Sequence, residues 1–244
     1  MAKKTKSKKA KSRPTLIQRV LNPYHWVRRW LVRLIILGLA TVLFVISAHA
    51  VFNPSRTFYM NSEARRLGQI DYIWVPISDV APVMARSVVA AEDANFCLHW
   101  GFDVEAIRAA LEEGSGRGAS TISQQVVKNV YLWQGRNWAR KAAEAVITPI
   151  VEAIWSKQRI IEVYLNVAEF DEGVFGVDAA AQHYFGVIPG KLSPLQAARL
   201  AAVLPNPKGR SASKPTKSLA RRARSIQDGA ETIRRDGRSA CFED

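Results

Sequence analysis

The feature that most constrains this chain is an uncharged, strongly apolar run at residues 34–52, which begins Leu-Ile-Ile-Leu-Gly-Leu-Ala-Thr-Val-Leu-Phe-Val-Ile. Its length is about what an α-helix needs to cross the hydrocarbon core of a bilayer. Trp26 and Trp30 precede it, and such aromatic side chains are typical of the membrane interface. We therefore predict one transmembrane helix over residues 34–52.

The charges flanking this run predict its orientation. Residues 1–33 contain 11 Lys and Arg and no acidic residue, and basic flanks stay in the cytoplasm. Everything after residue 52 is then expected outside. Ala48-His-Ala50 resembles a signal-peptidase site, but the long apolar run and the long basic region before it favour an uncleaved anchor.

The basic character of the chain belongs to its ends. The chain has 244 residues and a net charge of +14, whereas residues 34–207 contain 14 basic and 16 acidic residues. This distribution disfavours a nucleic-acid-binding face and favours contact of the ends with anionic phospholipid. The predicted organisation is a basic cytoplasmic tail (1–33), a transmembrane helix (34–52), a connector (53–79), one catalytic domain (80–207) and a basic C-terminal extension (208–244).

The stretch from Ala90 to Asp103 is the first candidate for chemistry. A helix is predicted from Val80 to Ala91, so Glu92 and Asp93 lie near its C-terminal end, where the helix dipole opposes a negative charge. This position suits a general base whose pKa must rise toward working pH. The alternative is an ordinary polar helix end.

A second candidate follows at residues 118–132. Ser120 or Thr121 can cap a helix there, and Thr121 with Gln124 fits a capping box. Helical spacing places Thr121, Gln124, Gln125 and Lys128 on one face, which would offer hydrogen-bond donors to a sugar and a phosphate. An ordinary polar helix surface remains the alternative.

The third candidate is Arg140-Lys-Ala-Ala-Glu144 on a helix predicted from Asn137 to Trp155. Spacings of three and four residues bring Glu144 beside both cations. Taken alone, this pattern favours a surface ion pair on a polar helix face, which substitution of either cation would leave folded. Ser156 is predicted to cap the next helix.

The remaining chemistry-bearing residues give weaker signals. Cys97 and Cys241 are too few for a disulfide framework and lack zinc-ligand spacing, so we interpret both as incidental. His183 is expected in the core or at its rim, and no metal site is predicted. Residues 103–113 are predicted to form an amphipathic helix followed by a flexible loop at residues 114–118.

Four stretches together resemble the peptidoglycan glycosyltransferase (murein polymerase) family. They are Glu92-Asp-Ala-Asn-Phe-Cys-Leu-His-Trp-Gly101, Gly118-Ala-Ser-Thr-Ile-Ser-Gln-Gln-Val-Val-Lys-Asn129, Arg140-Lys-Ala-Ala-Glu144 and Ser156-Lys-Gln-Arg-Ile-Ile-Glu-Val-Tyr-Leu-Asn166. They occur in the order of the family's motifs and span about residues 80–207. The chain departs from the family pattern at Asp171, which usually is Gly, and at Gln196, where an acid is common.

The resemblance implies a mainly α, lysozyme-like glycosyltransferase domain with a smaller membrane-facing lobe, of the monofunctional biosynthetic type. Such enzymes polymerise lipid II into linear β-1,4 glycan strands by inverting transfer, with release of undecaprenyl diphosphate. A bacterial inner-membrane protein with a periplasmic catalytic domain is therefore expected. Its expected partners are lipid II, the growing glycan, the membrane and other cell-wall synthesis or division proteins.

Residue roles also follow from the resemblance. Glu92 would be the base, and Glu144 would orient the cations or assist. Substrate-binding positions are the following: Asp93, Phe96, His99, Ser120, Thr121, Gln124, Gln125, Lys128, Asn129, Arg140 and Lys141. A divalent cation, Mg²⁺ or Mn²⁺, would be an optional cofactor that helps to neutralise the phosphates.

Two other functions compete with this one. A lysozyme-like murein hydrolase or lytic transglycosylase would need an acid at the bond but no cluster of cations. A non-catalytic, membrane-anchored cell-wall scaffold would need neither Glu92 nor the cations. Polymerisation of lipid II, as opposed to solubilisation of finished murein, separates these alternatives.

Overall fold

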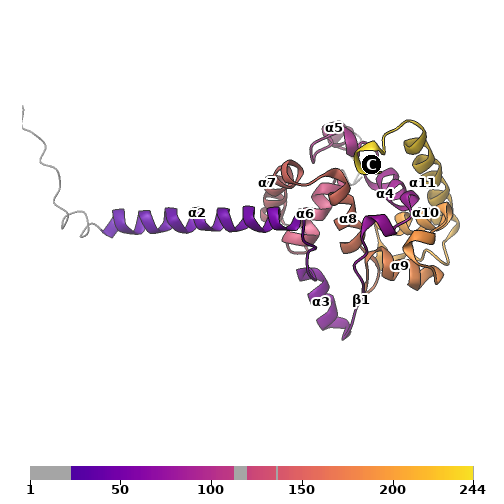
Figure 1. Cartoon of the computed structure of the whole chain (residues 1–244), viewed down its shortest axis with the longest axis horizontal. Helices are drawn as coiled ribbons and strands as arrows, with labels where there is room; N and C mark the ends of the chain where they lie inside the picture. The colour runs from indigo at the N-terminus through magenta and orange to yellow at the C-terminus, as the bar shows by residue number, and fades with distance from the viewer. Residues whose placement is uncertain (1–22, 113–119, 136, 244) are drawn as a thin grey trace, which may run out of the picture. The chain divides into compact units, whose positions relative to one another are not determined.

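The computed structural model describes residues 23–112, 120–135 and 137–243 (Figure 1). Most of the basic tail and the loop at 114–118 lie outside the described residues. The apolar run forms α2 (Pro23–His49), which is long and apolar enough over His25–His49 to cross a membrane. The helix begins before Leu34 and ends before Phe52, because nothing between residues 23 and 34 interrupts helical backbone.

The chain divides into two compact units, with the break between Val45 and Ile46. The second unit is mainly α, as predicted. Its elements are α3 (Phe58–Leu67), β1 (Asp71–Tyr72), η1 (Ile77–Asp79), α4 (Pro82–Glu92), η2 (Phe96–Leu98), α5 (Val104–Glu112), α6 (Ile122–Tyr131), α7 (Trp138–Ile154), α8 (Lys157–Val167), β2 (Glu169–Asp171), β3 (Val174–Phe175), α9 (Gly176–Phe185), η3 (Pro189–Lys191), α10 (Pro194–Val203), η4 (Pro207–Gly209), α11 (Lys217–Arg235) and α12 (Ala240–Glu243).

Several helices begin where a short polar side chain caps them. Thr121 and Ser193 each form a complete capping box, with Gln124 and Gln196 as the reciprocal partners. Ser156 caps α8, as its position in the sequence predicts. The amide of Gln196 accepts a hydrogen bond from the Ser193 backbone N–H at 2.9 Å, so this departure from the family pattern preserves the cap.

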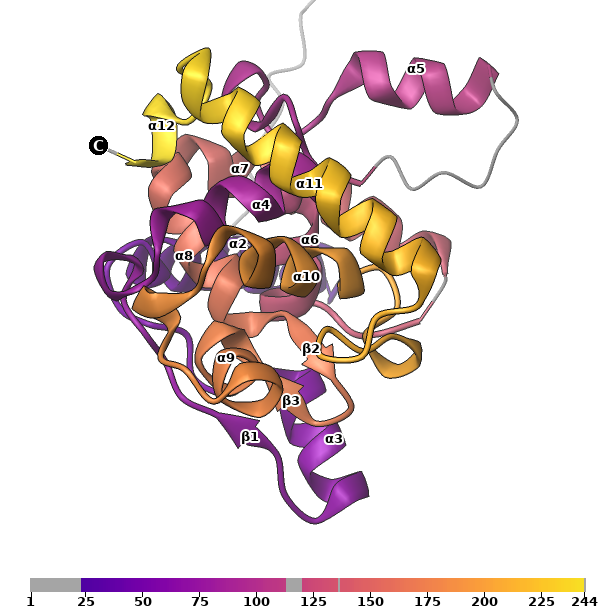
Figure 2. The same ribbon diagram turned by 90° about the vertical axis from the view of Figure 1, so that its right-hand side faces the viewer.

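The core lies between α4, α6, α8 and α10, and α11 crosses the outer side of α4 and α10 (Figure 2). Leu219, Ile226 and Ile233 point from α11 into this core. The sequence predicted a domain boundary at residue 207, but packing continues through α11. The basic composition of this segment suggested an extension outside the domain, but only the exposed face of α11 is basic and its other face is buried in the domain.

A small sheet with strand order β1-β3-β2 closes one side of the unit. β1 is parallel to β3, and β2 is antiparallel to it. Asp171, the second departure from the family pattern, accepts hydrogen bonds at the end of β2 from Tyr184 Oη at 2.8 Å and His183 Nε2 at 3.2 Å. His183 is partly exposed, at the rim of the molecule.

The amphipathic helix predicted at residues 103–113 forms as α5, but it buries none of its residues. Val104 and Leu111 are 53% and 77% exposed. The helical spacing of the apolar residues therefore predicted the helix correctly. No described residue covers its apolar face, however.

Candidate active site

Glu92 ends α4 and lies beside α6. Its carboxylate accepts a hydrogen bond from Gln125 Nε2 at 3.0 Å, and Gln125 Oε1 accepts one from Tyr164 Oη at 3.3 Å. Burial raises the pKa of Glu92, while the Gln125 hydrogen bond and the positive charges of Arg222 and Lys128 oppose that shift. A carboxylate that is largely removed from water, yet still favoured as an anion by these contacts, has the properties of a general base.

Glu144 is the other glutamate of the site and is buried, only 2% exposed on α7. Arg140 Nη1 donates to it at 2.5 Å, and Lys141 Nζ donates to its other oxygen. The expectation of a surface ion pair on a polar face was therefore wrong about burial. Both cations compensate a carboxylate inside the protein, so their removal is expected to affect stability as well.

Lys128 interacts electrostatically with both carboxylates. Burial lowers its pKa, and the negative charges of Glu144 and Glu92 oppose that shift. Among the described residues, none accepts a hydrogen bond from its ammonium group. Lys128 is thus a cation at the site that can donate to a ligand without giving up a protein partner.

The polar face predicted on α6 is only partly open. Thr121 and Gln124 are 2% and 4% exposed, and they satisfy each other in the capping box. Thr121 Oγ1 also donates to the Gly101 carbonyl at 2.7 Å. These two side chains hold the start of α6 in place and are largely covered, which corrects the expectation of an open donor face, although Thr121 also lines the pocket beside Glu92.

The other predicted residues of this helix are accessible. Gln125, Lys128 and Asn129 are partly exposed, and Ser120 is exposed just before the helix. Lys141 Nζ approaches Ser120 Oγ at 3.4 Å, which brings the second and third motifs together.

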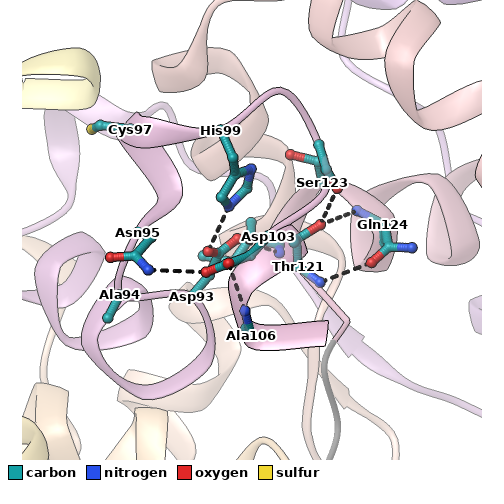
Figure 3. A network of polar contacts seen from close by, with 12 residues as sticks. Asp93, Ala94, Asn95, Cys97, His99, Asp103, Ala106, Thr121, Ser123 and Gln124 are labelled. Carbon is teal, nitrogen blue, oxygen red and sulfur yellow. Dashed lines mark hydrogen bonds and ion pairs between the residues drawn. The ribbon is translucent and has the colours of Figure 1, made fainter. Parts of the chain in front are cut away.

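A polar network fixes the loop that follows Glu92 (Figure 3). Asp93 binds His99 Nε2 at 2.8 Å through one oxygen and the Ile122 backbone N–H at 3.0 Å through the other. Asp103 accepts from Asn95 Nδ2 at 3.0 Å and from the Ala106 N–H at 2.9 Å. The first motif is thereby tied to the N-terminal ends of α5 and α6.

Asp93, His99 and Asp103 are also spaced closely enough to surround a metal ion, with ligand atoms within 4.8 Å of one another. However, both oxygens of each carboxylate already accept hydrogen bonds. The donor set therefore has its carboxylate oxygens committed to protein donors, while His99 Nδ1 is buried without a hydrogen-bond partner among the described residues. It does not fit a resident divalent cation.

Phe96 is completely buried, unlike a side chain that contacts substrate. The Lys157 ammonium lies 4.3 Å from the centre of its ring and donates to the His99 carbonyl at 2.8 Å. Lys157 also pairs with buried Glu152 at 2.8 Å. Lys157 thus supports the motif from the start of α8, with the Phe96 ring and the His99 carbonyl as its contacts.

Glu92 and the loop that follows it line an open pocket of about 280 Å³. Its walls come from the end of α4, the following loop, the start of α5 and the residues before α6. They are Ala90, Ala91, Glu92, Asp93, Ala94, Asn95, Asp103, Ala106, Ser120 and Thr121.

Sequence reasoning missed three contributors. Tyr164 belongs to the fourth motif, and its role as a buried partner of Gln125 follows only from the packing of α8 on α6. Arg222 comes from the segment to which no activity was assigned. The third is a disulfide, Cys97–Cys241, with a Cα–Cα distance of 5.8 Å. The interpretation of both cysteines as incidental was wrong, because folding joins residues 144 positions apart that share no spacing pattern.

Comparison with known proteins identifies the family of this chain. The transglycosylase family model matches residues 61–230. The chain belongs to the transglycosylase family. The matched span includes most of α11, in agreement with its packing on the core and not with a boundary at residue 207.

Several curated relatives share one description. A biosynthetic peptidoglycan transglycosylase of Jannaschia sp. (strain CCS1) is 56% identical over 244 residues, covering 99% of each chain. Proteins of the same description from Rhodospirillum centenum (strain ATCC 51521 / SW) and Caulobacter vibrioides (strain ATCC 19089 / CIP 103742 / CB 15) are 43% and 47% identical. The first covers 85% of this chain and 92% of its own, and the second covers 70% and 77%.

Proposed function

We propose that this protein polymerises lipid II into linear β-1,4 glycan strands of peptidoglycan. The carrying observation is the pairing of a partly buried, hydrogen-bonded Glu92 with three cations gathered around buried Glu144. Membership of the transglycosylase family and the shared description of its relatives support this assignment.

Glu92 is proposed as the base. It would take the proton from the 4-hydroxyl of the acceptor GlcNAc while that oxygen forms a bond to C1 of the donor sugar. The bond from C1 to the phosphate oxygen breaks, and undecaprenyl diphosphate leaves. Attack opposite an α-linked leaving group gives the β-1,4 linkage. Gln125 would orient Glu92, because its amide already binds the carboxylate.

Lys128, Arg140 and Lys141 are proposed to stabilise the negative charge that develops on the diphosphate. Positioned cations act most strongly where water is excluded. Glu144 holds Arg140 and Lys141 in place through its two oxygens. Glu144 is in this way a positioning residue for the cations.

A divalent cation is proposed at most as an optional cofactor that reaches the site with the diphosphate. Glu144 and the Asp93 network have their oxygens committed to protein donors. No step above depends on such an ion. Assays with Mg²⁺, with Mn²⁺ and with a chelator test whether one is needed.

The membrane orientation is also a proposal. We expect residues before α2 in the cytoplasm and the catalytic domain on the outer side of the cytoplasmic membrane, since the basic flank is one-sided. Reporter fusions or cysteine labelling beyond residue 60 that reported a cytoplasmic location would contradict the orientation.

The decisive experiment incubates the purified full-length protein with labelled lipid II and separates the products on a gel. Glycan strands that grow with time and release undecaprenyl diphosphate are expected. Solubilisation of finished murein with no strand formation would indicate the hydrolase alternative. Neither activity in a folded protein would indicate a scaffold.

A further inference from the structure

The C-terminal arm, defined here as residues 217–243, contacts the chain on both sides of Glu92. On the N-terminal side, α11 lies against the last turn of α4: a Cβ atom added to Gly229 would come within 3.2 Å of Ala90 Cβ. Arg222 Nη2 reaches the Ala91 carbonyl at 3.5 Å. The arm thus contacts the residue directly before Glu92.

On the C-terminal side, the end of the arm holds the loop after Glu92. Arg238 Nη1 donates to the Ala94 carbonyl at 3.1 Å. The Phe242 ring is 1% exposed and its centre lies 6.3 Å from that of Phe96. The Cys97–Cys241 disulfide joins the two segments covalently.

A further ion pair anchors the arm to the body of α4. Arg86 Nη1 and Glu243 lie 2.7 Å apart, and both side chains are largely buried. The arm therefore contacts α4 at Arg86 and at the last turn of α4, and it also contacts the loop that follows α4. Glu92 itself turns the other way, toward Gln125 on α6.

We propose that the C-terminal arm positions Glu92 for proton transfer and that the Cys97–Cys241 disulfide locks it in place. The inference rests on the proposed role of Glu92 as the base. A general base must lie within hydrogen-bond reach of its proton, and a displacement of about 1 Å can cost about 10²-fold in rate. The loop after Glu92 is short and rich in turns, so a fixed arm limits how far it can move.

The outer side of a bacterial membrane permits this bond, because disulfides persist in oxidising compartments. Reduction breaks the S–S bond and yields two thiols, with two electrons and two protons supplied by a thiol reductant. The lock is thus reversible. Lost activity should return when the bond forms again.

The test measures lipid II polymerisation by the full-length protein in detergent, with kcat and KM determined separately. The double variant Cys97→Ser/Cys241→Ser is expected to lose about tenfold in kcat with KM changed by less than about twofold, within the range a misplaced base can cost. Oxidised wild-type protein should lose activity to the same extent in reductant and regain it on reoxidation. The double variant should not respond to reductant.

Two controls make the result specific. Arg234→Gln alters an exposed side chain of the same arm, whose described hydrogen bonds are to Glu231 on α11, and should keep wild-type kcat. Circular dichroism and binding of a phosphoglycolipid inhibitor such as moenomycin check that each protein is folded at the assay temperature. If the double variant is poorly folded, reduction of folded wild-type protein decides the question.

Wild-type kcat in the folded double variant, or in fully reduced wild-type protein, overturns the inference. Failure of the proposed function gives a different result. In that case the oxidised wild-type protein forms no strands at all, whereas failure of the inference alone leaves strand formation intact and independent of the disulfide.

Discussion

At the scale of single residues, Glu92 works as a base only if its carboxylate can accept a proton from a positioned hydroxyl. Glu92→Gln keeps the size of the side chain but cannot accept that proton. We expect polymerisation to fall by at least about 10²-fold while the protein folds and binds a phosphoglycolipid inhibitor. Glu105→Gln, the same change at an exposed position on α5, should have no effect. Near wild-type polymerisation by Glu92→Gln would move the base elsewhere, with Asp93 and Glu144 as the next candidates.

The pH dependence of the rate should report the same carboxylate. Glu92 acts when ionised, so the rate is lost as pH falls through its pKa, which burial raises above the ordinary 4.5. The Gln125 amide lowers this pKa, so Gln125→Leu should raise it and move the acidic limb of the kcat profile to higher pH. Gln134→Leu, at an exposed position on the loop after α6, is the matched control. If the acidic limb of the kcat profile stayed at the same pH in Gln125→Leu, Glu92 would not be the group that controls it.

Arg140 and Lys141 should matter both for catalysis and for stability. Loss of one donor that stabilises developing charge costs on the order of 2.7–4 kcal/mol, or 10²–10³ in rate. Lys141→Met also removes one of the two cations that pair directly with buried Glu144, and this should lower the free energy of unfolding.

The two contributions can be separated by a second substitution. The double variant Lys141→Met/Glu144→Gln removes the uncompensated charge, so we expect stability in urea to recover while kcat stays low. Glu144→Gln alone should reduce kcat less than Glu92→Gln does. Recovery of full turnover in the double variant would show that Lys141 only balances Glu144.

At the scale of elements, Asn166 joins α8 to the segment that follows β1. Its side chain accepts from the Val75 N–H at 2.9 Å and donates to the Val75 carbonyl at 2.8 Å. Asn166→Ala leaves two buried backbone groups without this partner, at about 1–3 kcal/mol each. Chemical denaturation should show the loss, while exposed Asn61→Ala should change stability little.

Helix positions were largely predictable because their signals are local. The caps at Thr121 and Ser156 begin helices where the sequence predicted them, and the apolar run became α2. Motif spacing likewise indicated which residues surround Glu92, and Gln125 and Lys128 lie next to it. The roles assigned to these residues remain proposals.

Nonlocal contacts were not predictable from the same patterns. Burial of Glu144 depends on how α7 packs against α6, and the exposed face of α5 cannot be distinguished from a buried one by its period. The partners of Cys97 and Arg222 lie more than a hundred residues away along the chain. Such pairs carry no spacing signal, so only the fold reveals them.

At the scale of the whole molecule, the disulfide should stabilise the catalytic unit apart from any effect on turnover. It closes a loop of 144 residues, and loss of such a bond typically costs about 2–4 kcal/mol, because the unfolded chain regains the freedom that the link removed. For a unit of this size each kcal/mol corresponds to about 2–4 °C in Tm. Cys97→Ser/Cys241→Ser should therefore melt several degrees below the oxidised wild type and together with the reduced wild type, in thermal scans at matched protein and detergent concentration. If all three forms melted at the same temperature, the noncovalent contacts of Phe242 and Glu243 alone would hold the arm on α4 and η2.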